Sequence, residues 1–143
     1  MADERLPGKK LQVRVLTPKG PAVVSESESV IAPGTLGQLE VLPGHIPLLT
    51  GIAPGVLTLG GSGERHVLAV ASGYMRVSGA DDIEILIEQA IPGADVDIAA
   101  AESDLADAEA DLKAWKDGIT ADYKTLQVRH AFAKARVDAH AAA

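Results

Sequence analysis

The sequence predicts an α+β protein, with an N-terminal antiparallel β-sandwich or barrel followed by a C-terminal antiparallel helical hairpin. All eight prolines, and every glycine except Gly118, lie at or before Gly93. From residue 96 onwards, 15 of the remaining 48 residues are alanine. Proline and glycine mark turns between short strands, whereas alanine favours helix. We therefore expect a β-domain over residues 9–93 and a helical domain over residues 94–143.

The first expected strand covers residues 11–16, where Leu11, Val13 and Val15 alternate with other side chains. This period of two is typical of a strand with one buried face. The serine- and glutamate-rich segment 25–29 predicts a solvated edge strand or turn. A phosphorylated or metal-binding acidic patch is the alternative for this segment.

Residues 37–50 are the most distinctive segment of the chain. Its two prolines and two glycines predict a short strand, a tight turn and a second apolar strand. Pro43 and Gly44 suit the central positions of a type II turn, because proline presets φ and glycine supplies the positive φ that follows. The segment contains no cysteine, no carboxylate pair and no serine nucleophile with a partner base. It therefore predicts a shaped surface rather than a reaction centre.

Two hairpins complete the predicted β-domain. The first joins residues 56–59 and 66–70 through the glycine-rich segment 60–63, and the second joins residues 74–77 and 83–87. A phosphate-binding loop would need a helix directly after residues 60–63, and no helix start follows. Many short strands separated by glycine turns are typical of a sandwich or barrel.

Apolar residues recur every three or four positions in the helical domain, which predicts two amphipathic helices. Asp95 or Asp97 can cap the first helix, and Gly118 marks the chain reversal. The first seam consists of Ile98, Ala101, Leu105, Ala108, Leu112 and Trp115, and the second of Val128, Phe132, Ala135 and Ala139. Alanine seams bury little area, so this hairpin is predicted to be held weakly and to be able to detach from the sheet.

Charge divides between the two helices. Residues 97–117 carry seven acids and two lysines, a net −5, whereas residues 119–140 carry two acids and four bases, a net +2. Opposite charges favour antiparallel pairing modestly, since an exposed pair contributes about 0–1 kcal/mol. Asp104, Asp107 and Asp111 share one helix face, which we expect to be exposed to solvent.

Composition excludes several classes of protein. The chain has 143 residues, 47% of them apolar, a net charge of −7 and no cysteine. Disulfides and thiolate chemistry are therefore excluded, and the absence of cysteine suits a reducing cytoplasm. The acidic balance argues against nucleic acid as a partner. No apolar run reaches the length of a membrane span, and the start, Met1–Arg5, lacks the apolar core of a signal peptide.

No catalytic, cofactor or metal site is predicted. The four histidines do not cluster, and His130 and His140 are ten residues apart rather than at the spacing of a helical zinc pair. His45, after the Pro43–Gly44 turn, is the one candidate for a functional role. Packing in the turn is the alternative for its side chain.

The pattern G-x-L-x-x-L-P-G-H-x-P-L-L-T over residues 37–50 resembles the epsilon subunit of F-type ATP synthases. Residues 11–18, 72–74, 97–101 and 133–139 also resemble that family, so the similarity spans about residues 9–140. The resemblance implies a non-catalytic subunit of the rotor stalk, without a cofactor, at the cytoplasmic face of the bacterial inner membrane. It would be peripheral to that membrane, through the complex alone.

The resemblance also implies partners and site residues. The sandwich would bind the gamma subunit and the c-ring, with His45 and Thr50 near gamma, Leu42 in the same surface, and Gln38 at the end facing the c-ring. Family members often have an acid where this chain has Gln38. The helices would fold onto the sandwich or extend along gamma towards the catalytic alpha and beta subunits and suppress ATP hydrolysis. The basic residues of that regulatory helix are Lys124, Arg129, Lys134 and Arg136.

Some relatives bind ATP through an Ile/Leu-Asp-x-x-Arg-Ala motif at the start of the first helix. Here Ala100 stands in the position of the arginine, so weak or no ATP binding is expected. Two other functions remain open from the residues themselves. One is a free-standing β-sandwich module for carbohydrate or peptide with a helical oligomerisation tail, and the other is an enzyme that uses His45 and nearby acids. Co-purification with gamma distinguishes the first from a stalk subunit, and loss of turnover in His45→Ala tests the second.

Overall fold

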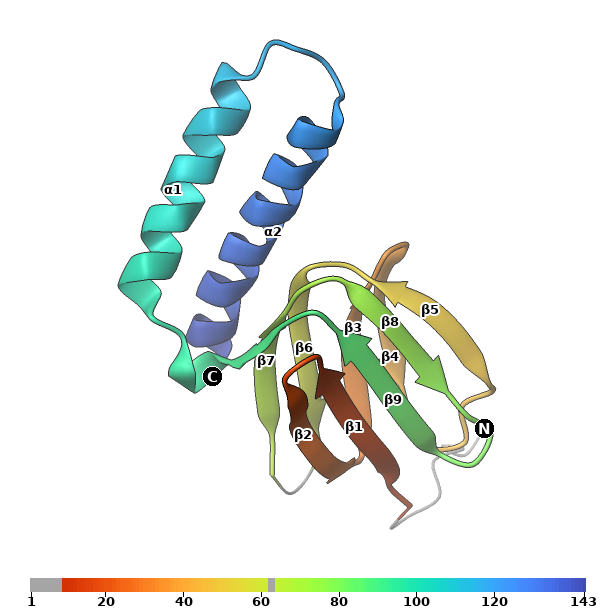
Figure 1. Cartoon of the computed structure of the whole chain (residues 1–143). Helices are drawn as coiled ribbons and strands as arrows, with labels where there is room; N and C mark the ends of the chain where they lie inside the picture. Colours follow the sequence, from red (N-terminus) through yellow and green to blue (C-terminus); the bar gives the residue numbers. More distant parts are fainter. Residues whose placement is uncertain (1–8, 62–63) are drawn as a thin grey trace, which may run out of the picture.

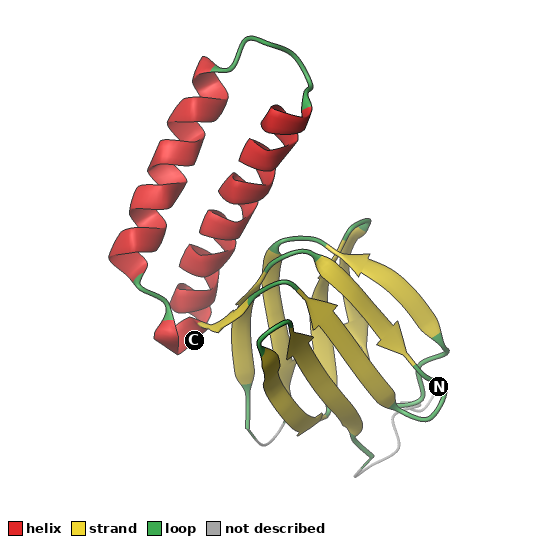
Figure 2. Cartoon of the chain, in the orientation of Figure 1, coloured by secondary structure: helices red, strands yellow, loops and turns green. Residues whose placement is uncertain are grey.

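The computed structural model describes residues 9–61 and 64–143, in which a β-sandwich is followed by two long helices (Figures 1 and 2). Met1–Arg5 and part of the predicted turn 60–63 lie outside the described residues. The strands are β1 (Leu11–Thr17), β2 (Gly20–Ser27), β3 (Ser29–Gly34), β4 (Gly37–Val41), β5 (Leu48–Ile52), β6 (Gly55–Gly60), β7 (His66–Val70), β8 (Gly73–Val77), β9 (Asp82–Ile87) and β10 (Ala90–Pro92). A 3-10 turn, η1 (Gly93–Asp95), leads to α1 (Ile98–Ala114) and α2 (Ala121–Ala142).

The strands form two layers. The front layer in Figure 1 has the order β2-β1-β9-β8-β5, and the second layer has the order β4-β3-β6-β7-β10. One residue pair, Gly34 with Ile52, joins the layers between β3 and β5. The predicted fold class is confirmed, as are both predicted hairpins, β6–β7 and β8–β9.

One pairing departs from the predicted antiparallel pattern. β1 and β9 run parallel, with Val13 opposite Ile83 and Val15 opposite Ile85. Parallel neighbours cannot be joined by a tight turn. The pairing therefore arises from residues about 70 positions apart, which local sequence patterns do not reveal.

The acidic segment 25–29 ends β2, an edge strand of the front layer, as predicted. Ser27 differs from the expected solvated residue because it is only 2% exposed. It lies opposite Leu11 in the register of β1 and β2, on the face that points into the sandwich. Ser27 Oγ lies 3.2 Å from Ser25 Oγ, so its hydroxyl has a hydrogen-bond partner.

Aliphatic side chains fill the space between the two layers. The buried cluster consists of Leu11, Val13, Val15, Val30, Ala32, Val41, Ile52, Leu57, Leu59, Leu68, Val70, Met75, Val77, Ile83, Ile85 and Ile87. The alternating burial of β1 and β9 follows the predicted period of two. This core makes the sandwich the rigid part of the molecule.

The two helices form the predicted antiparallel pair, and α2 lies against the outer face of β6 and β7 (Figure 1). Phe132, Ala135 and Ala139 of the second seam pack on Val67 and Ala69. Val128, predicted on the same seam, is 47% exposed because α2 extends past the edge of the sandwich. Neither helix is both long enough and apolar enough to span a bilayer, within the part of the chain that the structure describes.

Candidate docking surfaces

The segment 37–50 contains the predicted turn. Gly44 has a φ of 88°, and the His45 N–H donates to the Leu42 carbonyl at 3.1 Å. A hydrogen bond from the fourth residue to the first and a positive φ at the third position define a type II turn. The prediction for Pro43 and Gly44 is therefore confirmed.

The four predicted partner-binding residues do not lie together. Gln38 is exposed near the tip of the β3–β4 hairpin, whereas Leu42 and His45 are half-buried beyond the other end of β4. Four residues of extended chain put roughly 13 Å between Gln38 and Leu42. Thr50 lies opposite Met75, a fully buried residue, so it occupies the inward-facing side of β5.

His45 makes a local contact. Its Nδ1 lies 2.6 Å from the Ile46 carbonyl oxygen, so that nitrogen carries the proton and donates. Among the described residues, no carboxylate is in contact with this imidazole.

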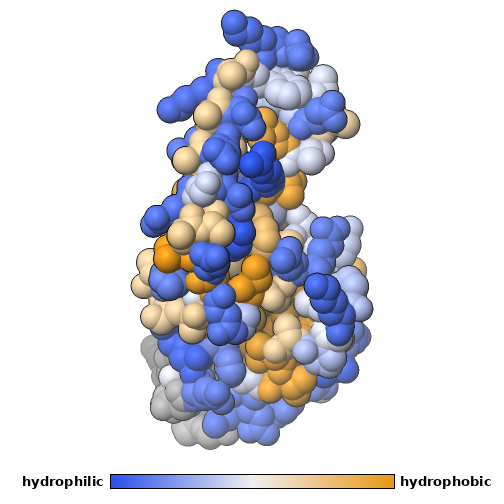
Figure 3. Space-filling view, turned by 60° about the vertical axis from the view of Figure 1, so that its left-hand side comes forward, coloured by the Kyte–Doolittle hydropathy of each residue, from blue (hydrophilic) through white to orange (hydrophobic). Residues whose placement is uncertain are grey.

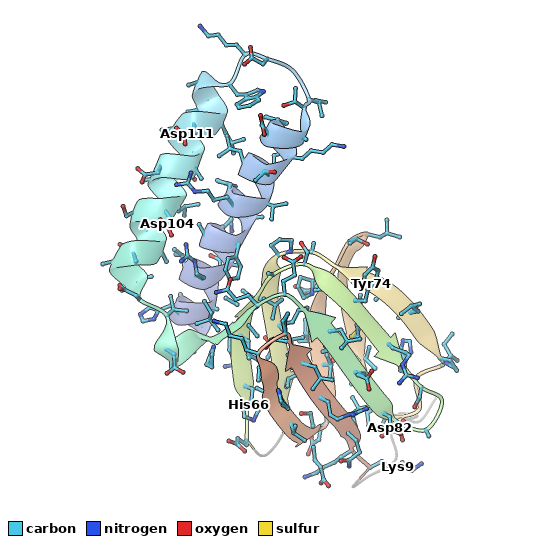
Figure 4. All side chains as sticks on the ribbon, in the orientation of Figure 1. Lys9, His66, Tyr74, Asp82, Asp104 and Asp111 are labelled. Carbon is cyan, nitrogen blue, oxygen red and sulfur yellow. The ribbon has the colours of Figure 1, made fainter. Side chains whose placement is uncertain are left out.

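An apolar row crosses the outer face of the front layer. Leu16 of β1, Leu86 of β9 and Tyr74 of β8 lie side by side in the strand register, and Gly51 of β5 continues the row. Tyr74 is 63% exposed and Leu86 is 49% exposed. These residues line an open groove of about 800 Å³, together with Thr35, and Figure 4 shows Tyr74 at the upper end of the sandwich. We call this groove the Tyr74 groove.

A charged row runs beside the apolar one. Arg14, Glu84 and Arg76 are adjacent in the strand register, and Leu49 ends the row. Glu84 forms an ion pair with Arg14 and a longer one with Arg76 at 3.7 Å. One acid shared by two arginines leaves a net positive charge, and Leu49 adds an apolar side chain that is 70% exposed.

The two outer faces of the sandwich differ in cover. α2 seals the outer face of β6 and β7, whereas no described helix lies over the outer face of the front layer (Figure 1). Figure 3 views the helical side, where hydrophobic surface lies among charged side chains at the junction of hairpin and sandwich. Among the described residues, no other element covers the Tyr74 groove, which is an apolar surface. The groove could not be predicted from the sequence, although Leu86 interrupts the apolar–polar alternation of residues 83–87.

The basic residues of α2 are mostly paired. Arg136 donates to Asp104 at 2.6 Å, Arg129 lies 3.6 Å from Asp111, and Lys134 pairs with Asp138 one turn away at 2.7 Å. Lys124 is exposed near the start of the helix. The predicted solvent exposure of this face of α1 agrees with the structure, since Asp107 and Asp111 are exposed and the Asp104 side chain is 44% exposed. What the sequence did not indicate is that Asp104 and Asp111 also pair with arginines of α2.

The Asp104–Arg136 pair has an electrostatic consequence. The hydrogen bond from the Arg136 guanidinium lowers the pKa of Asp104, against a smaller opposing effect of desolvation. The charge of Arg129 contributes in the same direction. Figure 4 labels Asp104 and Asp111 on α1.

Within the described residues, no group of three or more histidines, aspartates or glutamates is arranged to hold a metal ion. The N-terminus of α1 could in principle bind an anion, but the side chain of its own N-cap residue, Asp97, already accepts a hydrogen bond there. The Asp97 carboxylate accepts from the Ala100 N–H at 3.1 Å. The described part of the molecule therefore combines a β-sandwich, one outer layer of which carries an open apolar groove, with a helical appendage.

Comparisons with known proteins identify the family. The model for the β-sandwich domain of the ATP synthase delta/epsilon chain matches residues 10–93. The ATP synthase epsilon chain of Synechococcus sp. (strain JA-2-3B'a(2-13)) is 41% identical over 93 residues, 65% of this chain and 67% of that protein. That of Desulfosudis oleivorans is 38% identical over 94 residues, 65% and 70% of the two chains. The chain belongs to the ATP synthase delta/epsilon family.

Solved structures support the same fold over the whole chain. A chain in the cryo-EM structure of the Euglena gracilis mitochondrial ATP synthase, OSCP/F1/c-ring, has a TM-score of 0.76 at 16% identity, covering 99% of this chain and 90% of its own. A chain of the Tetrahymena thermophila mitochondrial ATP synthase central stalk and c-ring has a TM-score of 0.61 at 15% identity, covering 92% and 96%. These two likenesses show that the fold of this chain, including the helical hairpin, recurs in those chains.

Proposed function

We propose that the protein is a non-catalytic rotor subunit in the central stalk of an F-type ATP synthase, and that the bare front layer binds gamma. The observation that carries this proposal is the Tyr74 groove beside an arginine-flanked row on the one uncovered layer of the described sandwich. Aromatic and arginine side chains dominate the energetics of interfaces, especially where an apolar centre has a polar rim. Tyr74, Leu86, Arg14 and Arg76 supply that arrangement.

The c-ring is the second partner in this proposal. The tip of the β3–β4 hairpin carries Leu36, which is fully exposed, and Gln38 follows on β4. A neutral tip of this kind would meet the polar loops of a c-ring through hydrogen bonds and apolar contact rather than through a carboxylate. The subunit would then lie at the cytoplasmic face of the bacterial inner membrane, peripheral to it through the complex.

The hairpin is the regulatory element in this proposal. Its described position, folded on β6 and β7, would be the non-inhibitory state. Detachment would free the arginines of α2 from Asp104 and Asp111 for acidic segments of the catalytic subunits. Lys124, Arg129, Lys134 and Arg136 then act as the contact residues predicted from the sequence.

The free-standing module remains the alternative. It accounts for the sandwich and for the apolar groove, but family membership argues for the stalk subunit. A carbohydrate site would also call for several exposed aromatic side chains, and Tyr74 stands alone in its row. The experiment below separates the two, since a free-standing module would have no affinity for gamma.

Gamma binding by the purified chain tests the proposal directly. Tyr74→Ala should weaken binding roughly tenfold to thirtyfold, because truncating an aromatic anchor at an interface costs about 2 kcal/mol. Ile119→Ala is the matched control, since Ile119 is 79% exposed at the far end of the hairpin. Titration calorimetry measures both, and circular dichroism checks the fold. Equal affinities for wild type and Tyr74→Ala would remove this groove from the interface.

A further inference from the structure

The turn between β8 and β9 is joined to the signature turn, Leu42–His45, by one side chain. Asp81 Oδ1 accepts a hydrogen bond from the Gly44 N–H at 2.7 Å, across 37 residues of sequence. Gly79 of the same turn approaches Pro47, because a Cβ on Gly79 would lie 3.5 Å from Pro47 Cγ. The β8–β9 turn therefore contacts the segment that leads into β5 at two points, Gly44 and Pro47.

Asp81 is itself held in place. Its backbone has a φ of 61°, and its carbonyl accepts from the Gln12 N–H at 2.9 Å. Its side chain is only 16% exposed, and Oδ2 lies 3.8 Å from Lys9 Nζ. The Ser78 hydroxyl accepts from the N–H groups of Ala80 and Asp82, which fixes the turn around it. The hydrogen bonds of this turn therefore hold the Asp81 carboxylate in a fixed position.

The loop of residues 42–47, which contains the signature turn, makes few other hydrogen bonds among the described residues. Its own backbone hydrogen bond is the one from His45 to Leu42, and the segment 45–47 has no regular secondary structure. Ile46 of this loop is 75% exposed, and Leu49, just inside β5, is 70% exposed, so the position of the loop backbone decides how both apolar side chains are displayed. A carboxylate that accepts from a backbone N–H forms one of the stronger hydrogen bonds in proteins.

We propose that Asp81 is a positioning residue for partner binding. It fixes the signature turn in its docking conformation through the Gly44 N–H, so that gamma meets a preformed surface. This inference rests on the proposed function, since it assigns a role within the same docking face. Preorganisation raises affinity, because a loop that is already ordered does not lose conformational entropy when gamma binds.

Two substitutions separate the hydrogen bond from the backbone conformation. Asp81→Asn keeps an oxygen acceptor, and asparagine tolerates a positive φ. Asp81→Gly tolerates that φ as well but removes the acceptor. Asp82→Gly is the matched control, because it adds a glycine at the next residue, which is exposed, without touching Gly44.

Hydrogen exchange and gamma affinity are the two measurements. The Gly44 amide of the wild type should be protected although Gly44 is exposed, and Asp81→Gly should speed its exchange about tenfold, as expected for one lost charge-assisted hydrogen bond. The same variant should bind gamma several-fold more weakly. Asp82→Gly should stay within about twofold of wild type in both measurements, and Asp81→Asn should lie between wild type and Asp81→Gly, because its amide oxygen keeps the hydrogen bond but loses the charge.

The outcomes distinguish this proposal from the function on which it rests. An unprotected Gly44 amide in the wild type contradicts the positioning role without any variant being made. If wild type binds gamma and Asp81→Gly binds equally well, the positioning role is wrong and the docking function stands. If wild type fails to bind gamma at all, the proposed function is wrong and the positioning role with it.

Discussion

At the scale of single residues, Arg136 links the two helices of the hairpin. It is 19% exposed, donates to Asp104, and its guanidinium carbon lies 5.4 Å from the centre of the Phe132 ring. Its Nε is buried with no hydrogen-bond partner among the described residues. A buried donor of this kind adds a desolvation cost, so the pair with Asp104 and the Phe132 contact must offset it.

The lowered pKa of Asp104 predicts a pH dependence of the hairpin. An aspartate whose folded-state pKa is depressed stabilises the fold above its unfolded pKa, near 3.9, and loses that contribution as pH falls through the folded pKa. The difference in melting temperature between wild type and Asp104→Asn should therefore be full at pH 7 and shrink below about pH 4. Asp107→Asn, on the same helix and exposed, is the control. A difference that stays constant from pH 7 to pH 2 would contradict the assignment.

Ala100 predicts that the isolated subunit does not bind ATP strongly. Its N–H already donates to the Asp97 carboxylate, so a phosphate would face a negative charge at the start of α1. Arg136, the nearest candidate to replace the missing arginine, is engaged by Asp104. Calorimetric titration with ATP should give a dissociation constant above the millimolar range. Sub-millimolar binding would show that another part of the chain holds the nucleotide.

At the scale of elements, the hairpin is attached to the sandwich by the last turns of α2. A Cβ on Gly93 would lie 2.3 Å from the Ala139 carbonyl oxygen, so the helix approaches η1 as closely as glycine allows. Arg65 adds a hydrogen bond to the Ala142 carbonyl at 3.1 Å, and His140 Nδ1 lies 3.3 Å from the Gly93 carbonyl oxygen. α1 packs mainly on α2, so these contacts decide whether both helices stay docked.

Gly93→Ala should open the hairpin. The added methyl group displaces the end of α2, and overpacking of a closed contact typically costs about 1–3 kcal/mol. Hydrogen exchange of α2 should accelerate, and the assembled complex should hydrolyse ATP more slowly if the extended hairpin inhibits. Gly60→Ala is the control, since its Cβ would meet Arg65 Cγ at an ordinary 3.8 Å. Unchanged exchange in α2 would show that Gly93 does not hold the hairpin closed.

At the scale of the whole molecule, local patterns predicted the elements and missed what depends on their pairing. The Pro43–Gly44 turn was predictable because both residues restrict their own backbone. The inward position of Thr50 depends on its register with Met75, which no local pattern contains. The row of Leu16, Leu86 and Tyr74 exists only after three strands, β1, β9 and β8, are aligned.

The helical half follows the same rule. Its two seams and its reversal near Gly118 were evident from spacing and composition, and the cap was narrowed to Asp95 or Asp97, of which the structure has Asp97. Which face of each helix meets the other was not, because that depends on how α2 docks on β7. The exposure of Asp104 was therefore predictable, whereas its pairing with Arg136 was not.

If this chain is a stoichiometric subunit of an ATP synthase, it should be recovered with the rest of the complex. Pull-down of the tagged full-length protein from the membranes of its source organism, followed by quantitative mass spectrometry, tests this most directly. We expect recovery of gamma in a one-to-one ratio, together with the alpha, beta and c subunits. Recovery of the chain alone, or of an oligomer of this chain without any ATP synthase subunit, would contradict it.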